Sequence, residues 1–115
     1  MNHDINHLNR VELYPYKTLI DEGVFSAMVG HLEVPALEQT KGLHSSLSPS
    51  ITHDLLVKEF GFDGLVVTDA LNMKGVSDYS GNQSSSLGSF LAGADLLLIP
   101  DDLPIAFEDI RNAIV

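Results

Sequence analysis

The spacing of apolar side chains marks out four segments of the chain as helices. In each segment the apolar positions recur at helical intervals, which places them on one face of a helix. The first predicted helix covers residues 13–22 and is followed by Gly23, a natural C-terminal cap. The second helix starts at Ser48-Pro49 and ends at Gly61. The third carries Leu87, Phe90 and Leu91 on one face and ends at Gly93. The last is capped by Asp101 or Asp102, and its apolar positions are Leu103, Phe107, Ile110 and Ile114.

Three short apolar runs between these segments predict strands, at residues 24–31, 64–69 and 95–99. The first run is small and apolar throughout, which indicates a strand buried on both faces. A helical segment is the alternative there, although the run is short for one. The second run predicts another buried strand, and the third follows Gly93 almost at once.

The order of these elements is one helix and then three strand–helix pairs. Strands that alternate with helices about 30 to 40 residues apart indicate parallel βαβ units with right-handed crossovers. We therefore expect an α/β fold with parallel strands, in which residues 1–115 form one small domain or a piece of a larger one.

The connections between these elements differ in length, and the difference points to a functional face. The helix-to-strand connections are tight, whereas the segments that leave the first two strands, residues 32–47 and 70–82, are long. In parallel α/β folds the chemistry gathers at the carboxyl ends of strands, where long loops can enclose a ligand. That face carries His31, Asp69 and Pro100.

Charge and composition exclude several classes of partner. Six basic residues against sixteen acidic ones give a net charge of −10, which disfavours nucleic acid and anionic lipid surfaces. No apolar run is long enough to span a bilayer, and the absence of cysteine excludes disulfides, thiolate metal sites and thiol nucleophiles. No signal peptide follows Met1, but we expect upstream sequence to be missing, so the location, cytoplasmic or exported, stays open.

A long stretch around the second strand resembles the most recognisable segment of family 3 glycoside hydrolases. It reads Glu-Phe-Gly-Phe-Asp-Gly-Leu-Val-Val-Thr-Asp-Ala-Leu-Asn-Met-Lys-Gly over residues 59–75. The runs 27–31 with 35–37, and 92–98, look like the preceding and following strands of that family. The resemblance implies a partial TIM (β/α)₈ barrel, namely its last three βα units with a preceding helix, in the C-terminal part of the barrel domain.

The same resemblance implies a catalytic role for Asp69, since the aspartate that closes this strand is the nucleophile in the family. Residues 70–73, Ala-Leu-Asn-Met, look like the β-N-acetylglucosaminidase branch, whereas many β-glucosidases place a tryptophan there. The implied activity is that of a retaining β-N-acetylhexosaminidase, which acts on an N-acetylglucosaminide or related β-glycoside and needs no cofactor or metal.

One part of the family's machinery has no match in these 115 residues. Residues 3–16 look like the segment just downstream of the branch's His- and Gly-rich loop, which carries the histidine that acts as acid/base. A retaining glycosidase needs both a nucleophile and an acid/base. We therefore expect the chain alone to be inactive, as a fragment whose exposed barrel edges could mediate self-association.

Three further residues are candidate substrate contacts, each with a structural alternative. His31 ends the strand before Asp69 and could bind substrate or orient the nucleophile, but could equally bond loop backbone. Met73 and Lys74 follow the nucleophile and could form the wall of the site, although Met73 could instead fill core. His44 and His53 are expected to be solvated, and no His, Asp or Glu set shows convincing metal-ligand spacing.

Two other functions remain open from the residues alone. The first is a non-catalytic carbohydrate-binding or assembly module that kept the half-barrel and lost the chemistry. The second is a flavodoxin-like phosphoacceptor, because such proteins also place an aspartate at the carboxyl end of a strand. The run from Asp69 to Gly75 argues against the phosphoacceptor.

Overall fold

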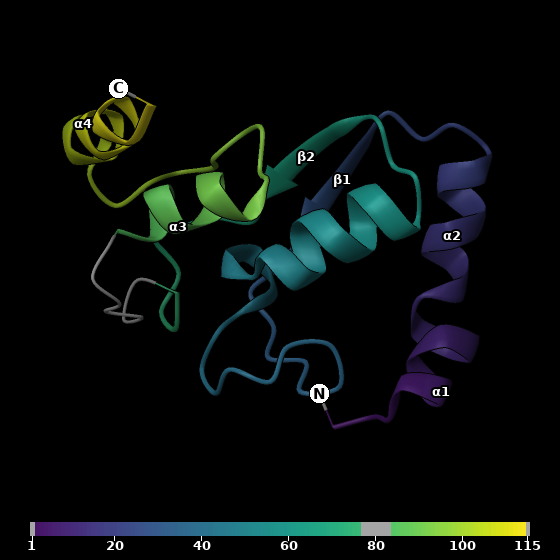
Figure 1. Ribbon diagram of the computed structural model, residues 1–115. Helices are drawn as coiled ribbons and strands as arrows, with labels where there is room; N and C mark the ends of the chain where they lie inside the picture. Colours follow the sequence, from purple (N-terminus) through teal and green to yellow (C-terminus); the bar gives the residue numbers. More distant parts are fainter. Residues whose placement is uncertain (1, 77–83, 115) are drawn as a thin grey trace.

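The computed structural model of the chain describes residues 2–76 and 84–114 (Figure 1). Helices and two short strands follow one another along it. The elements are α1 (Ile5–His7), η1 (Leu8–Glu12), α2 (Tyr14–Asp21), β1 (Ser26–Val29), η2 (Ser45–Leu47), η3 (Ser50–Glu59), β2 (Leu65–Thr68), α3 (Ser85–Ala92) and α4 (Leu103–Ile114). None of the helices in the described residues is long and apolar enough to cross a bilayer.

The two strands form a parallel pair, which confirms the predicted α/β organisation. Ser26 lies opposite Leu65 and Val29 lies opposite Thr68. The helix η3 connects the strands and lies along them in Figure 1. A helical crossover of this kind is what a parallel connection requires, because a short turn cannot join two parallel strands.

The third predicted strand is reduced to one bridge, so this prediction is wrong in its extent. Leu96 alone pairs with Val67 of β2, in parallel. Further along, the N–H of Leu98 donates to the Thr68 hydroxyl, 3.0 Å away, rather than to a strand backbone. Ile99 then adopts a φ of 45°, which turns the chain out of the extended conformation. A side-chain acceptor and this turn therefore replace the expected ladder.

The expectation that the first two strands are buried on both faces is also wrong. One face of the pair, which carries Val29, Val66 and Thr68, is buried. The opposite face is open: Met28 of β1 is 59% exposed and Leu65 of β2 is 45% exposed. The apolar pattern is present on both faces, but the described elements cover only one. We call the open face of the β1–β2 pair the bare face.

Two small cores hold the molecule together. The first packs Val29, Phe62, Val66 and Ala94 against partly buried side chains of α2 and η3. The second joins Leu47 of η2 to Leu71 and Val76, which lie in the loop after β2. This second core anchors the loop that follows Asp69.

The predicted helix boundaries agree with the structure where a local signal sets them. The hydroxyl of Ser48 accepts the N–H of Ile51 at 3.3 Å, before η3, and the carboxylate of Asp102 accepts the N–H of Ile105 at 3.0 Å, at the start of α4. Gly23 and Gly93 follow the ends of α2 and α3 with φ values of 87° and 115°. Only glycine adopts such values without strain, so these residues end the helices.

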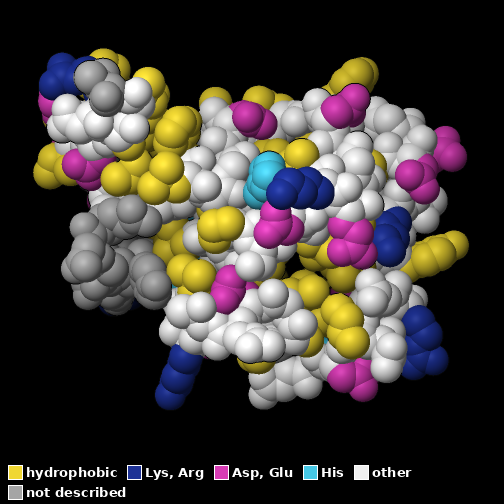
Figure 2. Space-filling model, viewed as in Figure 1, with side chains coloured by type: hydrophobic (Ala, Val, Ile, Leu, Met, Phe, Trp, Pro, Cys, Tyr) yellow, Lys and Arg dark blue, Asp and Glu magenta, His cyan; other side chains and the backbone are white. Residues whose placement is uncertain are grey.

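The packing of α3 differs from what its apolar stripe suggests. Phe90 and Leu91 face solvent, whereas the small residues Ser89 and Ala92 are completely buried. Small side chains let α3 approach η2, η3 and α4 closely. Figure 2 shows hydrophobic side chains exposed over α4 and its neighbourhood at the upper left.

Candidate functional site

Asp69 lies at the carboxyl end of β2, where the sequence places it. Its N–H donates to the carbonyl of Val29, 3.0 Å away, so the pairing with β1 continues one residue beyond the strand. Its Oδ1 accepts the N–H of Ala70 at 2.7 Å. Side chains alternate along a strand, and Thr68 points into the core. This alternation directs the half-buried Asp69 toward the bare face.

His31 lies just beyond β1 and joins two loops. Its Nε2 lies 2.9 Å from the carbonyl of Ala70, and its Nδ1 lies 2.7 Å from the hydroxyl of Ser46. A carbonyl can only accept, so Nε2 donates to Ala70, while Nδ1 and the Ser46 hydroxyl share the second hydrogen bond. Both nitrogens are therefore engaged within the chain, and the ring holds the residue next to Asp69.

The loop that leaves β1 is fixed by a group of buried serines. The hydroxyl of Ser45 donates to the carbonyl of Gly30 at 2.5 Å, and its own carbonyl accepts the hydroxyl of Thr52 at 2.8 Å. Ser45, Ser46 and Thr52 are all buried. Because these bonds tie the carboxyl end of β1 to η2 and η3, the wall on this side of Asp69 is rigidly attached to the core.

A carboxylate in the same loop is held in its charged form. Glu38 accepts the hydroxyl of Ser48 at 2.6 Å and the N–H of Thr40 at 2.9 Å. The Ser48 hydrogen bond, followed by the Thr40 backbone bond, lowers the pKa of Glu38 below its ordinary value. Glu38 thus links Thr40 to Ser48 through two charge-assisted hydrogen bonds.

The loop after Asp69 has a buried side and an exposed side. Leu71 and Val76 are fully buried, and the N–H of Leu71 donates to the carbonyl of Leu98 at 2.8 Å. Met73 is 46% exposed and Lys74 is exposed as well. Met73 therefore does not fill the core under the loop, which was its structural alternative. Residues 77–82 of the predicted loop lie outside the described residues.

Two further aspartates have structural roles. The carboxylate of Asp95 accepts the N–H of Val66 at 2.9 Å, so it completes the edge of β2. Asp102 caps α4, as described above. These bonds support strand and helix-cap chemistry at Asp95 and Asp102 rather than a cation site.

The two remaining mid-chain histidines differ in their exposure to solvent. His53 is exposed on η3, as expected, with Nδ1 lying 3.2 Å from a carboxylate oxygen of Asp54. His44 is partly buried, which corrects the expectation that it is solvated. Its ring packs beneath the loop after Asp69, 3.6 Å from where a Cβ on Gly75 would lie.

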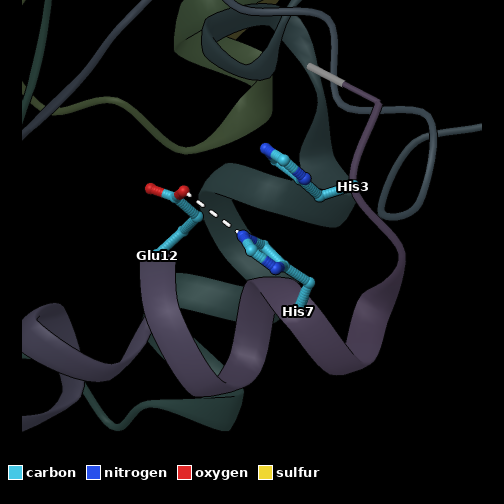
Figure 3. Close-up of side chains that lie close together, drawn as sticks. All are labelled: His3, His7 and Glu12. Carbon is cyan, nitrogen blue, oxygen red and sulfur yellow. Dashed lines mark ion pairs between the residues drawn. The ribbon is translucent and has the colours of Figure 1, made fainter.

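Three side chains near the start of the chain form a cluster that the sequence did not single out. His3, His7 and Glu12 each offer one ligand atom, and these atoms all lie within 4.8 Å of one another. Figure 3 shows the two imidazole rings stacked, with the carboxylate of Glu12 turned toward His7. The spacing of the two histidines, four residues apart, was the available signal, because such a pair can share a helical face.

A parallel strand pair joined by a helical crossover, with a carboxylate at the carboxyl end of β2, defines an α/β protein. In such folds functional groups gather at that end of the sheet. The chain belongs to glycosyl hydrolase family 3, because the model of that family's N terminal domain matches residues 1–114. The resemblance inferred from residues 59–75 is therefore confirmed.

Individual relatives agree with the branch inferred from residues 70–73. The chain is 32% identical to beta-hexosaminidase A of Pseudoalteromonas piscicida over 110 residues, which cover 87% of this chain and 18% of that protein. It is 34% identical to beta-hexosaminidase LpqI of Mycobacterium tuberculosis over 110 residues, which cover 90% of this chain and 28% of LpqI.

Among solved structures, the chain is similar to a family 3 β-N-acetylglucosaminidase from Paenibacillus sp., with a TM-score of 0.89 and 35% identity. That match covers 96% of this chain and 22% of the neighbour. The chain thus spans between 18% and 28% of the length of these proteins. The matched part contains Asp69 and both loops around it.

Proposed function

We propose that this chain supplies the nucleophile of a retaining β-N-acetylhexosaminidase, and that the nucleophile is Asp69. The observation that carries the proposal is the position of this carboxylate. It closes β2 within the segment that resembles the family's nucleophile strand, and alternation along β2 directs it to the bare face. The names of the relatives favour hydrolysis over a non-catalytic carbohydrate-binding or assembly module.

The chemistry follows from the geometry of the carboxylate. The Ala70 N–H holds Oδ1, so Oδ2 is the oxygen that attacks the anomeric carbon. Attack forms a glycosyl-enzyme ester as the glycosidic bond breaks, and a water molecule then hydrolyses the ester.

The neighbouring candidates take different roles in this proposal. His31 positions the nucleophile loop through the carbonyl of Ala70, since both of its ring nitrogens are already bonded. Met73 and Lys74 are exposed beside the nucleophile and form the wall that contacts the N-acetylglucosaminide or related β-glycoside.

The proposal also covers the architecture of the working domain. Residues 1–115 represent the last βα units of a (β/α)₈ barrel with a preceding helix, and the bare face belongs to the barrel interior. A full barrel needs about 250 residues, and a retaining mechanism needs an acid/base in addition to Asp69. The 115-residue chain by itself is therefore expected to show no turnover.

Kinetics of matched aspartate variants test the nucleophile. The gene product that contains this chain, with any upstream coding sequence, is assayed with an aryl N-acetyl-β-glucosaminide. Asp69→Ala is expected to lower kcat by at least about a thousandfold, because the covalent step is lost. Asp63→Ala is the control, because Asp63 is an exposed residue before the opposite end of β2. Turnover retained in Asp69→Ala would refute the assignment.

A further inference from the structure

The cluster of His3, His7 and Glu12 lies outside the proposed glycosidase site, at the start of the chain. His3 comes before α1, His7 ends α1 and Glu12 ends η1. The rings of His3 and His7 stack with centroids 4.0 Å apart and planes inclined by 19°. Nε2 of His7 lies 3.8 Å from a carboxylate oxygen of Glu12. Three donor groups from three separate backbone positions therefore converge on one small volume (Figure 3).

The winding of η1 explains why Glu12 joins the two histidines. In a regular α-helix, residues three or four apart share a face, and a residue five positions on does not. Here the N–H of Leu13 bonds the carbonyl of Leu8, five residues earlier, at 2.7 Å. This wider turn brings Glu12 back beneath His7. Such turns are rare and occur frequently at functional sites.

We propose that His3, His7 and Glu12 bind a divalent transition-metal ion of the zinc class. Two imidazoles and one carboxylate are a donor set that Zn²⁺ accepts, with a fourth position left for water. Bonds of about 2.0–2.2 Å in a tetrahedral site place ligand atoms about 3.4 Å apart. The 3.8 Å pair is already close to that spacing. His3 is exposed, so its ring is free to close the remaining gap by side-chain rotation.

The ion would fasten the first residues of the chain to the helical segment that follows. Of the groups placed around the cluster, Asp4 adds a carboxylate that accepts the N–H of His7 at 2.7 Å and so orients the start of α1. The bound ion adds a cross-link between His3 and Glu12, nine positions apart. Metal binding and ordering of residues 3–12 are then coupled, as in other small metal-stapled segments.

Titration of the 115-residue chain, without an affinity tag, tests the site. Isothermal calorimetry with Zn²⁺ is expected to show one equivalent bound with micromolar affinity, and Co²⁺ should give the intense visible absorption of a tetrahedral centre. His3→Ala, His7→Ala and Glu12→Gln should each weaken Zn²⁺ binding by roughly tenfold or more, since each removes one of three protein ligands.

His53→Ala is the matched control, because His53 is an exposed histidine beside a carboxylate. It should leave Zn²⁺ binding unchanged. Glu12→Gln preserves the shape of the side chain and removes the charged ligand. Circular dichroism of this variant shows whether the fold is retained, so loss of the ligand is separated from loss of the fold. The proposal is overturned if the wild-type chain binds no Zn²⁺, or if His53→Ala weakens binding as much as the three site variants do.

Discussion

At the scale of single residues, Gly64 shows how closely the chain is packed where it enters β2. A Cβ built on Gly64 would lie 2.3 Å from the carbonyl oxygen of Phe25 and 2.7 Å from the ring of Phe62. The carbonyl belongs to the backbone and accepts the N–H of Leu65. Neither it nor the buried ring can yield without disturbing the start of the strand pair.

Gly64→Ala is accordingly expected to lower the free energy of unfolding by about 1–3 kcal/mol, the usual cost of overpacking. Gly30→Ala is the matched control, because a Cβ there meets nothing within 4 Å and its φ is not positive. Urea unfolding of the two variants measures the difference. Equal stabilities would show that the approach between Gly64 and Phe25 does not constrain the fold.

Glu38 makes the stability of the chain depend on pH in a predictable direction. Hydrogen bonds from Ser48 and Thr40 lower its pKa below the ordinary value of 4.5. The stabilisation is therefore fully present above that value and is lost as the pH falls through the lowered pKa. Glu38→Gln should destabilise the chain at pH 7, and the difference from wild type should shrink on acidification.

Thermal unfolding between pH 7 and pH 3 measures this effect, with Glu59→Gln as a control at an exposed position on η3. A difference between wild type and Glu38→Gln that stays constant over this range would contradict the role of the two hydrogen bonds. The role would also be contradicted if the difference between wild type and Glu59→Gln shrank on acidification in the same way as the difference for Glu38→Gln.

At the scale of elements, the second core is the support of the loop that follows Asp69. Leu71 is fully buried in it, next to Leu47 and Val76. Leu71→Ala should cost roughly 2–5 kcal/mol in unfolding free energy, because it leaves a cavity that the loop cannot fill. Leu91→Ala should change stability by no more than about 0.5 kcal/mol, since Leu91 is 54% exposed on α3. Chemical denaturation that ranks the two variants the other way round would overturn this description of the core.

Local signals account for the elements that the sequence predicted well. The hydroxyl of Ser48, the carboxylate of Asp102 and the glycine after α3 each act within a few residues of a helix end, so their effect is visible in the sequence. The predicted strand at residues 95–99 forms only at Leu96, because beyond it the Thr68 hydroxyl and the loop at Leu71 take the place of strand partners. Those partners are distant in the sequence, and no periodicity encodes them.

In the candidate site too, some features follow from the sequence and others depend on contacts between distant segments. The position of Asp69 at the end of a strand follows from the apolar run before it and from the resemblance of that run to a known family. The partners of His31 depend on where two long loops meet, which the sequence does not specify. The cluster at His7 and Glu12 depends on one wide helical turn, which residue spacing alone does not predict.

At the scale of the whole molecule, the bare face is the feature that bears most on self-association. Parallel sheets are normally covered on both faces. Here Met28 is 59% exposed and Leu65 is 45% exposed, while α4 presents Leu103, Phe107 and Ile114 to solvent. The net charge of −10 opposes association, but these apolar side chains remain exposed to solvent.

We therefore expect the isolated chain to self-associate through its bare face. Sedimentation velocity should show species larger than a monomer, and Met28→Glu together with Leu65→Lys should shift the distribution toward the monomer by making that face polar. Phe107→Glu on α4 serves as a comparison outside the strand pair. A stable, well-folded monomer of the wild-type chain at micromolar concentration would contradict the expectation.

The proposed mechanism requires Asp69 to become covalently bonded to the sugar. The most direct measurement uses a fluorinated N-acetylglucosaminyl donor whose glycosyl-enzyme forms quickly and hydrolyses slowly. After reaction with the gene product that contains this chain, proteolysis and mass spectrometry should locate one sugar on the peptide that carries Asp69, and no label on the Asp69→Ala protein. A sugar attached to a different residue, or labelling that persists in Asp69→Ala, would refute the assignment of Asp69 as the nucleophile.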